Sequence, residues 1–130
     1  MEIKMAGYHI DIEDKTEKNE NFREVLFTGP HSQLVVMALK PGEEIGQETH
    51  HDIDQFIRVE AGEGVGYIGG EEFPLEDGSA IVIPAGEEHN VVNTSADKPL
   101  KLYTVYTPPE HPDGTIHKTK AEADADEHHH

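Results

Sequence analysis

Short hydrophobic runs recur along the middle of the chain, and many of them alternate with polar residues. Runs of about four to eight residues of this kind are typical of β-strands, whose successive side chains point to opposite faces. Turn-favouring residues separate the runs, as at Gly69-Gly70 and Asp77-Gly78. The pattern therefore predicts an all-β barrel or sandwich. The predicted strands are Glu24–Thr28, Gln33–Leu39, Gln55–Val59, Gly64–Ile68, Ser79–Ile83, His89–Asn93 and Leu100–Thr107.

The two ends of the chain lack this pattern. Helical periodicity is weak and confined to residues 12–22. Directly after Thr107, three prolines and a glycine in residues 108–114 prevent a continuing strand or helix. From Ala121 onward the chain is Ala, Asp and Glu, and its last three histidines are either a purification tag or a natural metal-binding tail. The predicted organisation is an N-terminal arm (1–23), a barrel (24–107), a Pro-rich segment over the barrel (108–120) and a disordered acidic and histidine-rich tail (121–130).

The charge of the chain limits its partners. The net charge of −17, from 27 acidic and 10 basic residues, argues against binding nucleic acid or an anionic membrane surface, which both require Lys and Arg. No apolar run is long enough to span a bilayer, and residues 1–12 lack a secretory signal. The chain has no cysteine, so we expect a cytoplasmic protein whose metal ligands, if any, are His, carboxylate or amide groups.

Two polar segments carry the candidate chemistry. Glu48 and His50 are two residues apart, so in an extended chain their side chains point to the same side. After a turn, Gln55 begins the next strand and can return alongside them. The Pro84-Ala85-Gly86 turn places His89 at the start of a later strand. The spacing thus allows Glu48, His50 and Gln55 to lie together, and it places His89 at the start of a later strand.

These two segments resemble the paired motifs of the cupin superfamily. The second motif, G-x5-P-x-G-x2-H-x3-N, matches at every specified position from Gly78 to Asn93. The first, G-x5-H-x-H-x3,4-E-x6-G, matches in spacing, but Glu48 stands for its first histidine and Gln55 for its carboxylate. The resemblance covers residues 33–106 and implies a cupin double-stranded β-helix of the jelly-roll type. It further implies one metal ion inside the barrel, held by Glu48, His50, Gln55 and His89.

Alternatives to this ligand set remain. The shorter form of the first motif would select Asp54, but only Gln55 leaves six residues before Gly62. Two imidazoles, a carboxylate and an amide oxygen favour a comparatively hard divalent metal, so we expect Mn or Fe, with Zn, Ni or Co as alternatives. A barrel that has lost its metal is the remaining alternative, because His50 and His89 can also be ordinary core histidines.

Strand parity predicts the walls of the pocket. If Gln55 points inward, Ile57 and Val59 do too, while Phe56 and Arg58 point outward. From His89, the same rule places Val91 and Asn93 inside. Because an exposed aromatic side chain on a barrel face is typical of a dimer contact, we expect a homodimer.

The histidines outside the motifs divide into two groups. His51 should point away from the cluster, since it neighbours His50 in an extended segment. His111 and His117 lie either on a solvated loop or on a segment that closes over the barrel and adds polar groups to the pocket.

The resemblance leaves three functions open. We expect an enzyme that acts on a small oxygenated organic or sugar-type substrate, as an oxygenase or an isomerase or epimerase, with Glu48 as general base if it is not a ligand. Phosphorylated substrates are disfavoured, because no Lys or Arg falls on a predicted inward position. The alternatives are a non-catalytic module that binds or senses a small molecule, and a barrel without metal.

Overall fold

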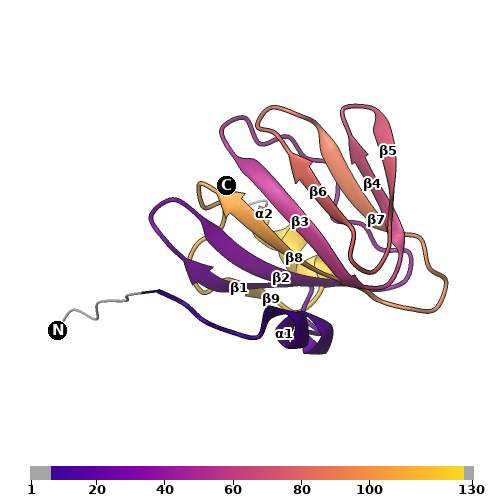
Figure 1. Ribbon diagram of the computed structural model, residues 1–130, viewed down its shortest axis with the longest axis horizontal. Helices are drawn as coiled ribbons and strands as arrows, with labels where there is room; N and C mark the ends of the chain where they lie inside the picture. Colours follow the sequence, from indigo (N-terminus) through magenta and orange to yellow (C-terminus); the bar gives the residue numbers. More distant parts are fainter. Residues whose placement is uncertain (1–6, 128–130) are drawn as a thin grey trace.

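The protein forms two antiparallel sheets that face each other in a jelly-roll barrel. This architecture is seen in a computed structural model, which describes residues 7–127 (Figure 1). The larger sheet has the strand order β6-β3-β8-β2-β1-β9, and the smaller has the order β5-β4-β7. The all-β jelly-roll fold predicted from the sequence is confirmed. The strands are β1 (Arg23–Thr28), β2 (Gln33–Leu39), β3 (Asp54–Ala61), β4 (Gly64–Ile68), β5 (Glu71–Leu75), β6 (Ala80–Ile83), β7 (His89–Asn93), β8 (Leu100–Thr107) and β9 (Ile116–His117).

The core lies between the two sheets and follows the predicted parity. On β3 the side chains of Gln55, Ile57 and Val59 are buried, while Phe56 and Arg58 are partly exposed. On β7, His89, Val91 and Asn93 are buried in the same alternating way. Apolar side chains from both sheets fill one cluster. Buried apolar side chains therefore surround the few polar side chains that point inward, such as Gln55 and His89.

The hairpin between β4 and β5 turns at Gly69-Gly70, one of the turn-favouring pairs of the sequence. Ile68 pairs with Glu71 across the turn. Both glycines have positive φ, 56° and 89°, which a two-residue hairpin turn requires and which costs glycine little. The turn residues therefore set the register of the smaller sheet.

A short helix, α1 (Ile12–Lys18), precedes the barrel. Asp11 caps it, since its side chain accepts a hydrogen bond from the backbone N–H of Asp14. The helix packs against β2, β3 and β8 and buries Thr16. The weak helical signal over residues 12–22 thus corresponds to two turns held by tertiary packing.

The segment predicted to be a disordered tail instead contains a helix, α2 (Lys120–Glu127). The Thr119 hydroxyl accepts from the backbone N–H of Glu122, and Ala123 is 2% exposed. A capped, alanine-rich first turn with one buried methyl group is sufficient to order this segment against the barrel. Residues 128–130 of the predicted tail lie outside the described chain.

The Pro-rich segment returns along the barrel. Gln33 holds it, because its side-chain oxygen accepts from the backbone N–H groups of Glu110 and His111, and its amide donates to the carbonyl of His111 at 2.7 Å. Further on, β9 pairs with β1 through Ile116 and His117. This segment therefore lies against β1 and β2, which belong to the same sheet as β3. Neither helix of residues 7–127 has the length and apolar content needed to cross a membrane.

Candidate metal centre

Backbone pairing brings Glu48 next to His89. The two residues form an isolated antiparallel bridge and exchange both backbone hydrogen bonds, each 2.9 Å long. Directly opposed residues of an antiparallel pair carry their side chains on the same face. The loop before β3 thus acts as an added strand of the smaller sheet, and it places a carboxylate beside an imidazole.

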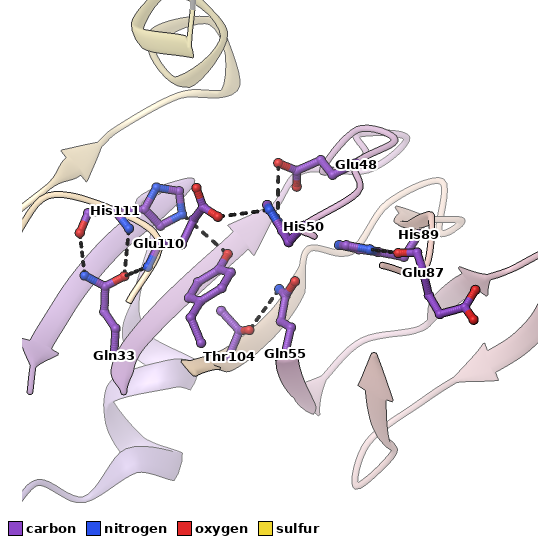
Figure 2. A network of polar contacts seen from close by, with 10 residues as sticks. Gln33, Glu48, His50, Gln55, Glu87, His89, Thr104, Glu110 and His111 are labelled. Atoms are coloured by element: carbon purple, nitrogen blue, oxygen red, sulfur yellow. Dashed lines mark hydrogen bonds and ion pairs between the residues drawn. The ribbon is translucent and has the colours of Figure 1, made fainter. Parts of the chain in front are cut away.

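His50 and Gln55 approach from the other side of the turn. The carbonyl of His50 accepts from the N–H of Gly86, in the turn before His89. Gln55 lies near the start of β3, 3% exposed, and its amide nitrogen donates to the Thr104 hydroxyl of β8 at 3.0 Å. Residues from separate parts of the chain therefore surround one point inside the barrel (Figure 2).

The ligand atoms of Glu48, His50 and His89 all lie within 4.8 Å of one another. Nε2 of His50 is 3.8 Å from Oε2 of Glu48, and the two imidazole ring centres are 5.3 Å apart. Figure 2 shows Gln55 below His50, with His89 beside them. Two nitrogens and a carboxylate at this separation can hold a divalent metal ion.

Three buried polar atoms support a ligand at this point. Nε2 of His50, Nε2 of His89 and Oε1 of Gln55 have no hydrogen-bond partner within the described chain. Leaving buried polar atoms unpaired costs about 1–3 kcal/mol each, so such atoms are rare and call for an explanation. One ion bound to all three would satisfy them together, and the residues present therefore fit a metal.

The opposite ring nitrogen of each histidine is already held. Nδ1 of His50 donates to Oε2 of Glu110 at 2.9 Å, and Nδ1 of His89 donates to the carbonyl of Glu87 at 3.0 Å. Carbonyl and carboxylate oxygens only accept, so each neutral ring carries its hydrogen on Nδ1 and presents a lone pair at Nε2. Metal-binding histidines are commonly oriented by such outer contacts.

The two imidazoles differ in their electrostatic surroundings. The hydrogen bond to Glu110, together with the Glu48 carboxylate, raises the pKa of His50 above its ordinary value. Burial lowers the pKa of His89, and the hydrogen bond to the Glu87 carbonyl only partly offsets this. The centre is therefore asymmetric, with negative charge gathered on the side of His50.

The structure also shows where the alternative ligand Asp54 and the neighbouring His51 lie. Asp54 is exposed, and its carboxylate accepts from the backbone N–H of Ala85 in the Pro84–Gly86 turn. It therefore lies outside the buried group, and Gln55 lies inside it. His51 is exposed, as its parity predicted.

A cavity of about 340 Å³ opens from the centre towards the C-terminal segment. Arg23, the first residue of β1, lines this cavity and is 2% exposed. This corrects the expectation that no cationic side chain points inward. Arg23 has the parity of buried Val25, so extending the predicted strand by one residue would have identified it. The residues that line the cavity are Arg23, Glu48, Thr49, His50, Glu110, His111, Pro112, His117 and Asp126.

The C-terminal segment contributes groups that motif spacing alone does not reveal. Nε2 of His111 lies 3.4 Å from the Tyr106 hydroxyl. His117 is 8% exposed, with Nδ1 3.1 Å from Nη1 of Arg23 and Nε2 2.9 Å from Oδ2 of Asp126. Of the two readings left open for these histidines, the structure supports polar groups beside the pocket. The local sequence does not predict these contacts, because they depend on where the C-terminal segment packs on the barrel.

Comparison with known proteins places these observations in a family. The Cupin_2 model, described as a cupin domain, matches residues 35–106. The uncharacterized protein YrkC of Bacillus subtilis is 48% identical over 124 residues, which make up 91% of this chain and 66% of that protein. The chain thus spans just under two thirds of that relative.

Solved structures agree with this assignment. BH2720 from Bacillus halodurans is 47% identical, with a TM-score of 0.88 over 91% of this chain and 93% of that one. A predicted oxalate decarboxylase from Thermotoga maritima is 25% identical, with a TM-score of 0.57 over 62% of this chain and 69% of that one. The matched domain, the relatives and the barrel agree: the chain belongs to the cupin family.

Proposed function

We propose that this cupin binds one divalent metal ion through Glu48, His50, Gln55 and His89 and is an enzyme acting on a small oxygenated organic or sugar-type molecule. The observation that supports the proposal is the grouping of the Glu48, His50 and His89 ligand atoms within 4.8 Å. Nε2 of His50, Nε2 of His89 and Oε1 of Gln55 are also buried without a hydrogen-bond partner in the described chain. With two neutral nitrogens and two oxygens, the set favours Mn or Fe.

A bound ion would supply Lewis-acid or redox chemistry beside a cavity that can admit a small molecule. The chain's own groups would orient the reactants. Glu110 and the Glu87 carbonyl hold the two imidazoles. Glu48, at the edge of the cavity, can accept a proton from a substrate whenever it is not itself a ligand.

Metal titration tests the first part of the proposal. The protein is best studied with His128, His129 and His130 changed to Ser, so that terminal histidines bind no metal. We expect one Mn²⁺ per chain, followed by electron paramagnetic resonance, and loss of this site in His89→Ala. His51→Ala is the matched control, since its histidine is exposed next to the centre. Equal binding by both variants would contradict the site.

Gln55→Leu tests the fourth ligand separately. This change removes the buried Oε1 atom while keeping a side chain of similar volume. We expect Mn²⁺ to bind more weakly but with unchanged stoichiometry, since the two imidazoles and Glu48 remain. An unchanged affinity would remove Gln55 from the ligand set.

Turnover separates an enzyme from the alternative, a non-catalytic binding or sensing module. Dioxygen uptake by the Fe²⁺-loaded protein is measured with small organic substrates. Product analysis follows for neutral and acidic sugars with the Mn²⁺-loaded protein under nitrogen. Dioxygen consumption would identify an oxygenase, and a changed sugar would identify an isomerase or epimerase. A ligand that binds and is recovered unchanged from both assays would favour the binding module.

A further inference from the structure

A buried arginine shares the cavity with the candidate metal centre. Arg23 lines the same cavity as Glu48 and His50 and is 2% exposed. Its guanidinium carbon lies 5.4 Å from the ring centre of Phe22. A guanidinium stays charged at every physiological pH, so its burial is favourable only where hydrogen-bond acceptors meet it.

The neighbours of Arg23 satisfy only part of this planar group. Nη1 donates to Nδ1 of His117, because a guanidinium can only donate. His117 therefore carries its hydrogen on Nε2 and donates it to Asp126, which makes it a neutral ring. The Nε–H of Arg23 is buried and has no hydrogen-bond partner in residues 7–127. The guanidinium thus contacts the neutral His117 ring and the Tyr106 hydroxyl, while its Nε–H has no acceptor in the described chain.

We propose that Arg23 binds the carboxylate of a small organic acid that also reaches the metal ion, so that the substrate class is small carboxylic acids with a second oxygen. This inference rests on the proposed metal centre. Arginine presents parallel N–H groups that match the two oxygens of a carboxylate. The cavity of about 340 Å³ that joins Arg23 to His50 limits the acid to a small one.

The charge of the cavity favours a carboxylate over a phosphate. Glu48, Glu110 and Asp126 line it together with Arg23. A phosphate monoester brings nearly two negative charges towards these carboxylates, whereas a carboxylate brings one. One arginine and one divalent ion therefore suit a monoanion.

The two arginines of the chain, Arg23 and Arg58, make a direct test available. In the Zn²⁺-loaded protein with residues 128–130 changed to Ser, ¹⁵N nuclear magnetic resonance should resolve two Nε–H signals, assigned with Arg58→Lys. We expect glycolate to shift the Arg23 signal saturably and leave the Arg58 signal in place. The neutral amide glycolamide should shift neither. Arg58 is the matched control, since its Nε also lacks a partner but it does not line the cavity.

Binding measurements on variants give a second readout. Arg23→Gln should weaken glycolate binding by about ten- to a hundredfold, the range of a charged hydrogen bond, with zinc affinity unchanged. If Arg23→Gln does not fold, Arg23→Lys keeps the charge without the planar fork and should also bind glycolate more weakly. Arg58→Gln should bind glycolate normally.

Three results would overturn the proposal. If the protein binds zinc but glycolate does not shift the Arg23 signal, the carboxylate site is wrong and the metal centre stands. If inorganic phosphate shifts the Arg23 signal at a lower concentration than glycolate does, the site prefers phosphate to a carboxylate. Absence of zinc binding would overturn both the metal centre and this inference.

Discussion

At the scale of single residues, a carboxylate outside the cupin motifs contacts a histidine of the candidate metal centre. Glu110 lies beyond the residues that the family model matches, 35–106, yet its Oε2 is 2.9 Å from Nδ1 of His50. This contact directs Nε2 of His50 towards Glu48 and His89. Glu110 is thus a positioning residue for a proposed metal ligand.

Glu110→Ala should lower the affinity for Mn²⁺ by about ten- to a hundredfold, as is usual when the outer partner of a metal-binding histidine is lost. The Mn²⁺ affinity of Glu110→Gln should lie between those of Glu110→Ala and the wild type, because the amide oxygen still accepts from Nδ1 of His50 but carries no charge. Isothermal titration calorimetry measures the affinity of each variant. Glu71→Gln, at an exposed position of β5, is the control. Wild-type affinity in Glu110→Ala would show that His50 needs no such support.

His111 predicts a pH-dependent loss of stability. Burial, with the nearby Arg23 charge, lowers the pKa of His111 to about 3, against a partial opposing effect of Glu110. Below an unfolded pKa near 6.5 the unfolded chain binds a proton at this residue and the folded chain does not, so the free energy of unfolding falls as the pH drops from about 6.5 towards 3. Above that window His111 contributes no pH dependence.

The variant His111→Gln should show a smaller loss of stability over this window, measured by urea unfolding of the metal-free protein at several pH values. The wild type and the variant share all other titrating groups, so the difference between their slopes isolates His111. Identical slopes would contradict the buried neutral state of this ring.

At the scale of elements, the C-terminal segment acts as a strap across the barrel. Gln33 on β2 anchors it through three hydrogen bonds to the backbone of Glu110 and His111. The strap then continues into β9 and α2, which supply His117 and Asp126 behind Arg23. One buried side chain thus links the barrel to the residues that complete the cavity.

Gln33→Ala should release this strap without unfolding the barrel. We expect the amides of Glu110 and His111 to lose protection from hydrogen exchange, while amides of β3 and β8 keep it. The loss of a buried hydrogen-bond network costs about 1–3 kcal/mol. Mn²⁺ affinity should fall as well, because Glu110 loses its position. Uniform loss of protection across the sheet would show that the strap and barrel unfold as one unit.

At the scale of the whole molecule, excess negative charge is the dominant feature. The chain carries 27 acidic and 10 basic residues. In the described part of the chain, each of the four ion pairs between an acidic residue and Lys or Arg has at least one side chain more than one third exposed. Such exposed pairs contribute little stability. Salt weakens both the repulsion among the acidic residues and the attraction within these ion pairs. Because the ion pairs contribute little, weakening the repulsion should have the larger effect, so salt should stabilise the fold.

Raising NaCl from about 10 mM to about 300 mM shortens the screening length from about 30 Å to about 6 Å. The melting temperature of the metal-free protein should consequently rise, as measured by circular dichroism. A melting temperature that falls with salt would show that ion pairs dominate instead. Sedimentation velocity over the same salt range checks the homodimer expected from the sequence.

Much of the fold could be predicted from local patterns. Alternation identified seven of the strands, and Gly69-Gly70 identified a turn, because strand parity and turn geometry are properties of a few adjacent residues. The helix α2 was missed although Thr119-x-x-Glu122 is a capping pattern, since the acidic composition suggested disorder. The strand β9 has two residues and pairs with distant β1, so no local signal could reveal it.

Part of the candidate site could likewise be predicted from the sequence, and part could not. Glu48, His50, Gln55 and His89 were predicted from their resemblance to motifs. In the structure the ligand atoms of Glu48, His50 and His89 lie within 4.8 Å of one another, and Gln55 is buried. That the four residues bind a metal stays a prediction. By itself the sequence thus determined the barrel, the four candidate ligands and the strong negative charge. Only the tertiary structure decided what surrounds those ligands: Glu110 behind His50, and Arg23 with His117 and Asp126 across the cavity. The reason is that these contacts join residues up to 94 positions apart, and their formation depends on the packing of the C-terminal strap on the barrel.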